Sequence, residues 1–177
     1  MGASCAGSTT LGTALAKQLS YPYFDTDSYF WEPSEIPFTI KRNPVVRNNI
    51  LKDHVAQHNN WILGGSMVSW GDEWPALFDL VVFLYIPHDI KMQRLMNREH
   101  ERYGEIISTD INRQTLHQEF VQWAKGYDDN TTKGRTLQVH QDWLKKLPCP
   151  VIEITGDTTV SQRISIILSN INNNNVL

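Results

Sequence analysis

Short apolar runs alternate with longer segments of helical periodicity along this chain. The runs that predict β-strands are 21–25, 61–66, 78–86 and 151–155. The segments that predict helices are 11–19, 44–58, 89–103, 116–127, 137–147 and 160–171. Because the run 78–86 is almost continuously apolar, we expect a parallel strand that is covered on both faces. The alternation predicts an α/β fold, a parallel sheet with helices on both sides.

The segment 44–58 begins with Pro44, a residue that suits the first turn of a helix. Val46, Ile50 and Val55 recur roughly on one side of this helix, as expected of an amphipathic helix.

A glycine-rich segment opens the chain and fits the phosphate-binding pattern Gly-x4-Gly-Lys-Ser/Thr at every defined position except one. Its residues are Gly2, Ala3, Ser4, Cys5, Ala6, Gly7, Ser8, Thr9 and Thr10, and Ser8 stands where the pattern has lysine. The two glycines allow the backbone to curl so that successive N–H groups face one anion, and the helix that follows adds its positive N-terminus. The alternative is a Gly/Ser-rich turn before an ordinary helix.

Two further motifs follow the loop in order. They read Tyr23-Phe-Asp25-Thr-Asp27-Ser-Tyr-Phe-Trp31 and Pro37-Phe-Thr-Ile-Lys41-Arg42. Together with the loop they resemble the small P-loop kinases of the adenylate, shikimate and gluconate kinase type. The resemblance is greatest to a bacterial adenylate-kinase-related group whose loops carry no lysine, and it covers nearly the whole chain.

The resemblance implies a single P-loop kinase domain over 1–177, of three layers, with a small helical lid. It places an acceptor-binding segment at about 28–60 and the lid at about 98–135. In such folds a buried strand precedes the loop, whereas only Met1 precedes Gly2 here. We therefore expect that a natural N-terminal segment of roughly five to eight residues, about one strand, is missing.

The resemblance also implies ATP and Mg²⁺ as cofactors. Residues 2–10 would bind the nucleotide phosphates, and Thr9 and Asp25 would hold the metal. Asp27 would orient the acceptor and accept its proton, while Arg98 and Arg102 would contact the transferring phosphate. The acceptor-binding residues implied are Asp27, Trp31, Arg42, Arg47 and Gly65.

The two aspartates are expected to face one pocket, because residues i and i+2 of a strand point the same way. The alternative is that Asp25 or Asp27 serves as a helix cap or forms an Asx-turn at the strand end.

The arginines of the segment 89–103 recur at a spacing of four residues, at Arg94, Arg98 and Arg102. Guanidinium groups pair well with phosphate oxygens, and these arginines, or Lys41, are candidates to supply the charge that Ser8 lacks. The alternative is a solvated face whose arginines pair with the acidic residues of the same segment, Glu99, Glu101 and Glu105.

Other groups carry weaker signals. An aromatic cluster would either stack on a planar acceptor or pack under a mobile lobe: Tyr29, Phe30, Trp31 and Phe38. Trp70, Asp72 and Trp74 would complete the pocket, and a late loop at Gly156 and Asp157 would contact the base. Cys5 is either a reactive thiol of the loop or a buried inert one. The histidines are interpreted as surface residues: His54, His58, His88, His100, His117 and His140.

Composition narrows the function classes. A net charge of −3 implies no general affinity for nucleic acid. Two cysteines do not suggest a disulfide framework, and no apolar run approaches the roughly 20 residues that cross a membrane. We expect a cytoplasmic protein, and its oligomeric state stays open.

Three functions remain as hypotheses. The first is a small-molecule kinase that transfers the γ-phosphate of ATP to a nucleotide, nucleoside or hydroxylated metabolite. The second is a nucleotide-binding regulatory or interaction protein with little or no phosphotransfer, which the loss of the lysine favours. The third is an α/β scaffold that binds no nucleotide.

Overall fold

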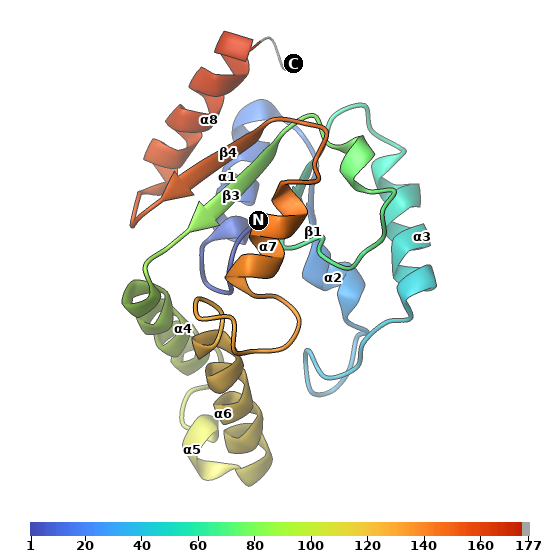
Figure 1. The fold of residues 1–177 in the computed structure, drawn as a ribbon. Coiled ribbons are helices and arrows are strands. Elements are labelled where there is room, and N and C mark those ends of the chain that lie inside the picture. Colours follow the sequence, from blue (N-terminus) through green and yellow to red (C-terminus); the bar gives the residue numbers. More distant parts are fainter. Residues whose placement is uncertain (175–177) are drawn as a thin grey trace. The chain divides into compact units, whose positions relative to one another are not determined.

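A computed structural model describes residues 1–174, with side chains up to Ile171. This part of the chain forms two compact units. The first comprises Met1, Ser8–Phe78 and the chain from Thr159 on, and the second comprises Gly2–Gly7 and Asp79–Thr158. Figure 1 colours both by sequence position.

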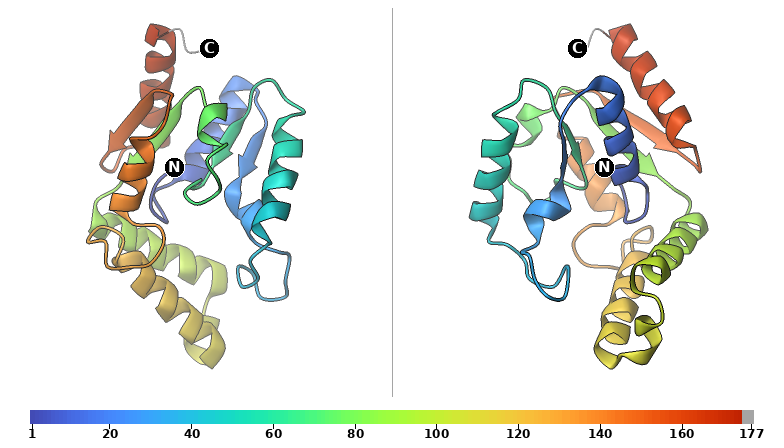
Figure 2. Two further views of the ribbon diagram at one scale, coloured as in Figure 1. Left: turned by 45° about the vertical axis from the view of Figure 1, so that its right-hand side comes forward. Right: turned by 180° about the vertical axis from the view of Figure 1, so that it is seen from behind.

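The first unit is built on a parallel strand pair. Its elements are α1 (Ser8–Leu19), β1 (Tyr23–Asp25), α2 (Thr26–Phe30), α3 (Pro44–Val55), β2 (Ile62–Gly64), the 3-10 helix η1 (Pro75–Leu77) and α8 (Val160–Asn174). In the β1–β2 pair, Asp25 lies opposite Gly64. The helix α1 contacts both strands and α8, and Figure 2 shows this unit in two further views.

The second unit is built on a longer parallel pair. Its elements are β3 (Val81–Tyr85), α4 (His88–Tyr103), α5 (Ile106–Thr109), α6 (Ile111–Lys125), α7 (Leu137–Leu144) and β4 (Val151–Thr155). Tyr85 at the end of β3 lies opposite Thr155 at the end of β4. Gly2 forms a parallel bridge with Leu84, so the first loop residue occupies a strand position beside β3. The helices α4, α5 and α6 pack together and follow β3 (Figure 1).

The strand β3 is buried on both faces. Phe83 and Leu84 point to opposite faces of a strand, and they are 2% and 1% exposed. The expectation from the apolar run 78–86 is therefore confirmed. The chain is an α/β protein with parallel strands, as the alternation predicts.

Most expected helices are present, but some bounds and two short helices were not foreseen. The helix expected at 116–127 starts at Ile111 instead, where the side chain of Asp110 accepts a hydrogen bond from the backbone N–H of Arg113 at 2.7 Å. The strand expected at 61–66 is confined to Ile62–Gly64. The helices α2 and α5 are too short to carry a hydrophobic period, and the sequence interpretation missed both.

The apolar residues Val46, Ile50 and Val55 of α3 differ in burial, because the buried face of the helix centres elsewhere. The buried residues of this helix are Arg47, Leu51 and Val55, whereas Val46 is 47% exposed. The reason is that Arg47 packs its guanidinium between two aromatic rings, which turns its side of the helix inward.

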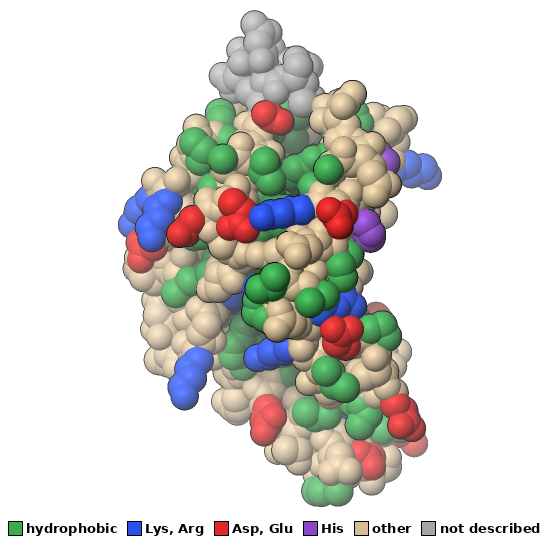
Figure 3. All heavy atoms as spheres, turned by 90° about the vertical axis from the view of Figure 1, so that its right-hand side faces the viewer, with side chains coloured by type: hydrophobic (Ala, Val, Ile, Leu, Met, Phe, Trp, Pro, Cys, Tyr) green, Lys and Arg blue, Asp and Glu red, His purple; other side chains and the backbone are tan. Residues whose placement is uncertain are grey.

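Acidic and basic side chains are interspersed on the face that Figure 3 shows. In the described part of the chain, the longest apolar stretch of any helix is too short to cross a membrane.

Candidate functional site

The glycine-rich segment adopts a tight curl. The backbone N–H of Ala6 donates to the carbonyl of Ala3 at 3.1 Å, and Gly7 has a φ of 91°. Cys5 also lies in the left-handed region, at a φ of 63°, which costs a residue with a Cβ more than it costs glycine. The helix α1 begins at Ser8, directly after this curl. The loop is therefore curled at Gly7 as expected, and its binding of nucleotide phosphates stays a prediction.

The structure brings Thr9 and Asp25 together. The Thr9 hydroxyl donates to Oδ2 of Asp25 at 2.9 Å. The same oxygen accepts a hydrogen bond from the Tyr23 hydroxyl at 3.0 Å. A hydroxyl and a carboxylate are hard oxygen ligands of the kind Mg²⁺ prefers, and Mg²⁺ usually takes only one or two such ligands from the protein. This pair therefore fits the metal role expected of Thr9 and Asp25.

Tyr23 positions that carboxylate, and the sequence interpretation assigned it no role. Its ring lies against two glycines, because a Cβ at Gly12 would approach the ring to 2.4 Å and one at Gly64 would meet the hydroxyl at 2.0 Å. Burial raises the pKa of Tyr23, and the negative charge of Asp25 adds to that rise. Tyr23 is therefore a neutral hydrogen-bond donor to Asp25 at physiological pH.

The premise that Asp25 and Asp27 share one strand is wrong. Asp25 ends β1 and is the N-cap of α2, and its Oδ1 accepts the backbone N–H of Asp27 at 3.0 Å. Asp27 lies in the first turn of α2. The capping bond competes with the strand and ends it, so the alternative of a helix cap is correct for Asp25. Asp25 nevertheless meets Thr9 through its second oxygen.

Gly65 follows β2 and lies against the turn between the aspartates. It has a φ of +100°, and a Cβ there would meet Oγ1 of the buried Thr26 at 1.8 Å. Only glycine allows this approach. The backbone of Gly65 is thereby held beside α2, on which Asp27 lies.

Arg47 is a buried cation, 6% exposed. Its guanidinium lies over the ring of Trp70 at 4.3 Å and over that of Phe30 at 4.9 Å. One nitrogen donates to the carbonyl of Ser69 at 3.0 Å, while Nε has no hydrogen-bond partner within the described residues. Burial lowers the pKa of Arg47. No carboxylate of the described chain forms an ion pair with it, so its charge is available to an anion.

Arg42 is engaged differently. It donates to the carbonyls of Ser28 and Tyr29 at 3.3 and 3.0 Å and pairs with Glu32 at 3.2 Å. These contacts hold the end of α2, so its charge is already matched by an acidic partner. Its role as an acceptor ligand stays a prediction.

The aromatic cluster does not form one open wall. Tyr29 is buried and its hydroxyl hydrogen-bonds His54 at 2.8 Å, and one face of Phe30 is covered by Arg47. Trp31 packs edge-on against Phe30 and Phe38. A role of Trp31 in binding the acceptor stays a prediction.

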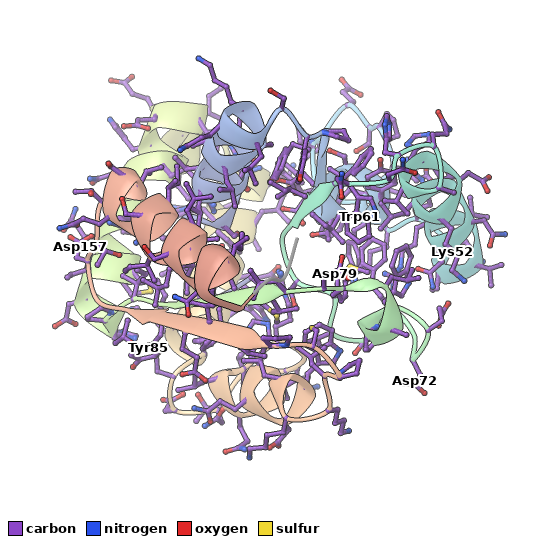
Figure 4. The ribbon with its side chains drawn as sticks, turned by 90° about the horizontal axis from the view of Figure 1, so that it is seen from above. Lys52, Trp61, Asp72, Asp79, Tyr85 and Asp157 are labelled. Atoms are coloured by element: carbon purple, nitrogen blue, oxygen red, sulfur yellow. The ribbon has the colours of Figure 1, made fainter. Side chains whose placement is uncertain are left out.

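Of the two tryptophans in the later loop, Trp70 lies beside Arg47. Trp70 carries the guanidinium and packs against the fully buried Trp74. Asp72 is exposed and projects outward in Figure 4.

In the second unit, Arg94 reaches the carboxyl edge of the strand pair. It forms an ion pair with Asp157, which follows β4. The backbone N–H of Gly156 donates to the carbonyl of Tyr85 at 2.9 Å, and Figure 4 shows Tyr85 and Asp157 toward the same end of the pair. Ligands of α/β sheets commonly bind at this edge, and a contact of Gly156 and Asp157 with the base stays a prediction.

The alternative of a solvated face, with Glu99 among its acidic residues, does not hold for Glu99. Glu99 is 2% exposed and lies 3.6 Å from each of three basic side chains, Arg98, Arg113 and His117. Arg113 and His117 come from α6, and the sequence interpretation gave Arg113 no role. The i, i+4 spacing of Arg113 and His117 was the available signal, but it becomes meaningful only once α6 packs on α4. Arg102 lies on the exposed side of α4.

The surface interpretation of the histidines is also wrong in two cases. His117 is 8% and His140 0% exposed. The hydroxyl of Tyr127 hydrogen-bonds Nδ1 of His140 at 2.7 Å, and burial lowers the pKa of His140 to about 3. His140 is a polar residue in the sequence, but its hydrogen bond to Tyr127 allows it to be buried in the core as a neutral side chain.

Sequence comparison finds a full-length relative. The uncharacterized protein YqaC of Bacillus subtilis (strain 168) is 37% identical over 174 residues, which span 98% of this chain and 96% of that protein. Shikimate kinase 2 of Syntrophotalea carbinolica is 53% identical over 36 residues, about a fifth of each chain. No protein-family model matches the chain.

Structural comparison identifies shikimate kinases. The enzyme of Bacteroides thetaiotaomicron has a TM-score of 0.57 at 20% identity, and the alignment covers 97% of this chain and 96% of that one. The enzyme of Aquifex aeolicus has a TM-score of 0.53 at 16% identity, covering 99% and 96%. At such identities the likeness shows the fold, which is the shikimate kinase-like α/β fold.

Proposed function

The chain belongs to the family of the Bacillus subtilis protein YqaC and has a shikimate kinase-like fold, and on this premise we propose that it is an ATP-dependent phosphotransferase acting on a small-molecule acceptor. The contact between Thr9 and Asp25 carries the proposal. It joins the residue that ends a phosphate-binding pattern to the carboxylate that ends β1, and a Gly/Ser-rich turn before an ordinary helix would need no such partner.

The residues have separate roles in this proposal. Backbone N–H groups of residues 4–9 bind the nucleotide phosphates, and Thr9 and Asp25 hold Mg²⁺, which neutralises phosphate charge when bound. The hydroxyl oxygen of the acceptor bonds to the γ-phosphorus of ATP, while the bond from that phosphorus to the β-phosphate oxygen breaks and ADP leaves. Asp27 accepts the proton that the acceptor hydroxyl loses. Arg98 and Arg102 stabilise the charge of the transferring group.

The acceptor is proposed to be anionic. A buried guanidinium without a carboxylate partner is costly, and a bound carboxylate or phosphate would compensate the charge of Arg47. The acceptor would also carry the hydroxyl to be phosphorylated. Shikimate, which the Acinetobacter baumannii kinase binds in its solved structure, and nucleoside monophosphates both satisfy these two conditions.

The test is transfer of labelled γ-phosphate from MgATP to three acceptors: shikimate, AMP and uncharged adenosine. We expect a labelled product with an anionic acceptor and none with adenosine. Asp25→Asn should abolish the transfer. Transfer to adenosine alone would contradict the anionic acceptor, and transfer to none, together with no binding of MgATP, would contradict the kinase.

A second candidate, a nucleotide-binding protein without phosphotransfer, is favoured by Ser8 at the lysine position. Tight binding of MgATP without turnover against a broad set of hydroxylated anions would support it over the kinase.

A further inference from the structure

A buried charge cluster joins α4 to α6 in the second unit. Glu99 lies 3.6 Å from Arg98 on its own helix and 3.6 Å from Arg113 and His117 on α6. One carboxylate therefore faces two guanidiniums, so the cluster holds one positive charge in excess even when His117 is neutral. All three separations exceed the length of a hydrogen bond, so Glu99 is shared and not committed to one partner.

The charges of this cluster act on the phosphate-binding loop. Burial raises the pKa of the Cys5 thiol, the positive charge of Arg98 opposes that rise, and the negative charge of Glu99 adds to it. Cys5 and both charged groups belong to the same unit. We therefore expect Arg98 to attract an anion at the loop and Glu99 to repel it.

Arg113 is held in a fixed position. Its guanidinium lies over the ring of Tyr103 at 3.5 Å, and its side chain is 13% exposed. Stacked there, it can neutralise Glu99 continuously, and the ring limits its other orientations. Arg98 is more open, at 36% exposure, and Glu99 is the acidic partner it has within the described chain.

We infer that Arg113 is a positioning residue of the nucleotide-phosphate site: by neutralising Glu99 it leaves the guanidinium of Arg98 free to bind nucleotide phosphate. This inference rests on the proposed function. It explains how a loop with Ser8 in place of lysine can retain an adequate positive charge, since the charge comes from a pair of arginines that share one carboxylate.

Variants that neutralise single charges of the cluster test this role. The quantity measured is the dissociation constant of MgATP. Arg113→Gln should weaken binding roughly tenfold, the size expected of one partly screened charge. Glu99→Gln should bind at least as tightly as the wild-type chain. The double variant Glu99→Gln/Arg113→Gln has the same net charge as the wild type and should recover affinity to within about threefold. Arg113→Lys, which keeps the charge, should also bind nearly normally.

Lys125→Gln is the matched control. It removes one positive charge from an exposed site on the same helix, about 18 Å along the axis from Arg113, and should leave MgATP binding unchanged. Unliganded melting temperatures are recorded for every variant, so that loss of folding is separated from loss of affinity.

The outcomes separate the inference from the proposed function. If the wild type binds MgATP and Arg113→Gln binds equally well, the inference fails while the kinase stands. If the double variant is as weak as Arg113→Gln, Arg113 acts by direct contact or by folding, and the inference again fails. If the wild type does not bind MgATP, the proposed function and the inference both fail.

Discussion

The hydroxyl of Thr9 donates a 2.9 Å hydrogen bond to Oδ2 of Asp25, which joins the first turn of α1 to the end of β1. The other oxygen of Asp25 caps α2. The capping role of this carboxylate needs only an oxygen, whereas the metal role in the proposed function needs its charge.

Asp25→Asn separates these two roles. Asparagine caps helices about as well as aspartate, so the melting temperature without ligand should change little. The stabilisation by ATP that depends on Mg²⁺ should largely disappear, because the amide is a poor ligand for the metal. Thermal unfolding with ATP, with and without Mg²⁺, measures both effects. Thr9→Val is expected to behave alike, and an unchanged response in both variants would exclude the metal role.

Arg47→Met should stabilise the folded chain and abolish phosphotransfer to the anionic acceptor. Removal of a buried cation without a carboxylate partner is expected to raise the free energy of unfolding by roughly 1 kcal/mol, in urea titrations without ligand. The same variant should lose phosphotransfer to the anionic acceptor while MgATP binding persists. Arg47→Lys, which keeps a charge but not the planar stacking group, serves as the control. A loss of more than about 2 kcal/mol in Arg47→Met would instead identify the guanidinium as a structural anchor.

Gly65→Ala should destabilise the chain by about 3 kcal/mol or more, because the new Cβ would overlap Thr26 in addition to straining the backbone. Gly134→Ala is the matched control: Gly134 also has a positive φ, of +84°, but a Cβ there has nothing within 4 Å. Gly134→Ala should lower the free energy of unfolding by only about 1 kcal/mol. Equal losses in chemical denaturation would show that the contact with Thr26 adds nothing.

His140 should make the chain sensitive to mild acid. Its pKa is about 3 when folded, against an ordinary value near 6.5, so the unfolded chain binds the proton more readily. Stability from this residue is complete above pH 6.5 and declines as the pH falls toward 3. Between pH 7 and pH 5 the free energy of unfolding should fall by roughly 2 kcal/mol on this account.

The variant His140→Gln tests that account, since it cannot take up the proton and should show a flatter profile over pH 5–7. His100→Gln, at an exposed position on α4, should keep the wild-type slope. If the two variants show the same slope, His140 does not cause the acid sensitivity.

The sequence by itself determined the α/β class, the parallel strands, the order of the main helices and the curl of the loop. These features depend on local periods and on glycine, which act within a few residues of the chain. Thr9 and Asp25, which the structure joins by a hydrogen bond, were also singled out by the sequence motifs. The helical state of Asp27 was not, because the cap by Asp25 competes with the strand in a way that alternation cannot reveal.

Only the tertiary structure decided which polar side chains are buried. Arg47 turned inward because Phe30 and Trp70, from distant segments, offer their ring faces. Glu99 is buried and not on a solvated face of α4, because Arg113 and His117 of α6 pack against it. The groups that surround a buried charge come largely from elsewhere in the chain, so a pattern along one helix cannot predict its burial.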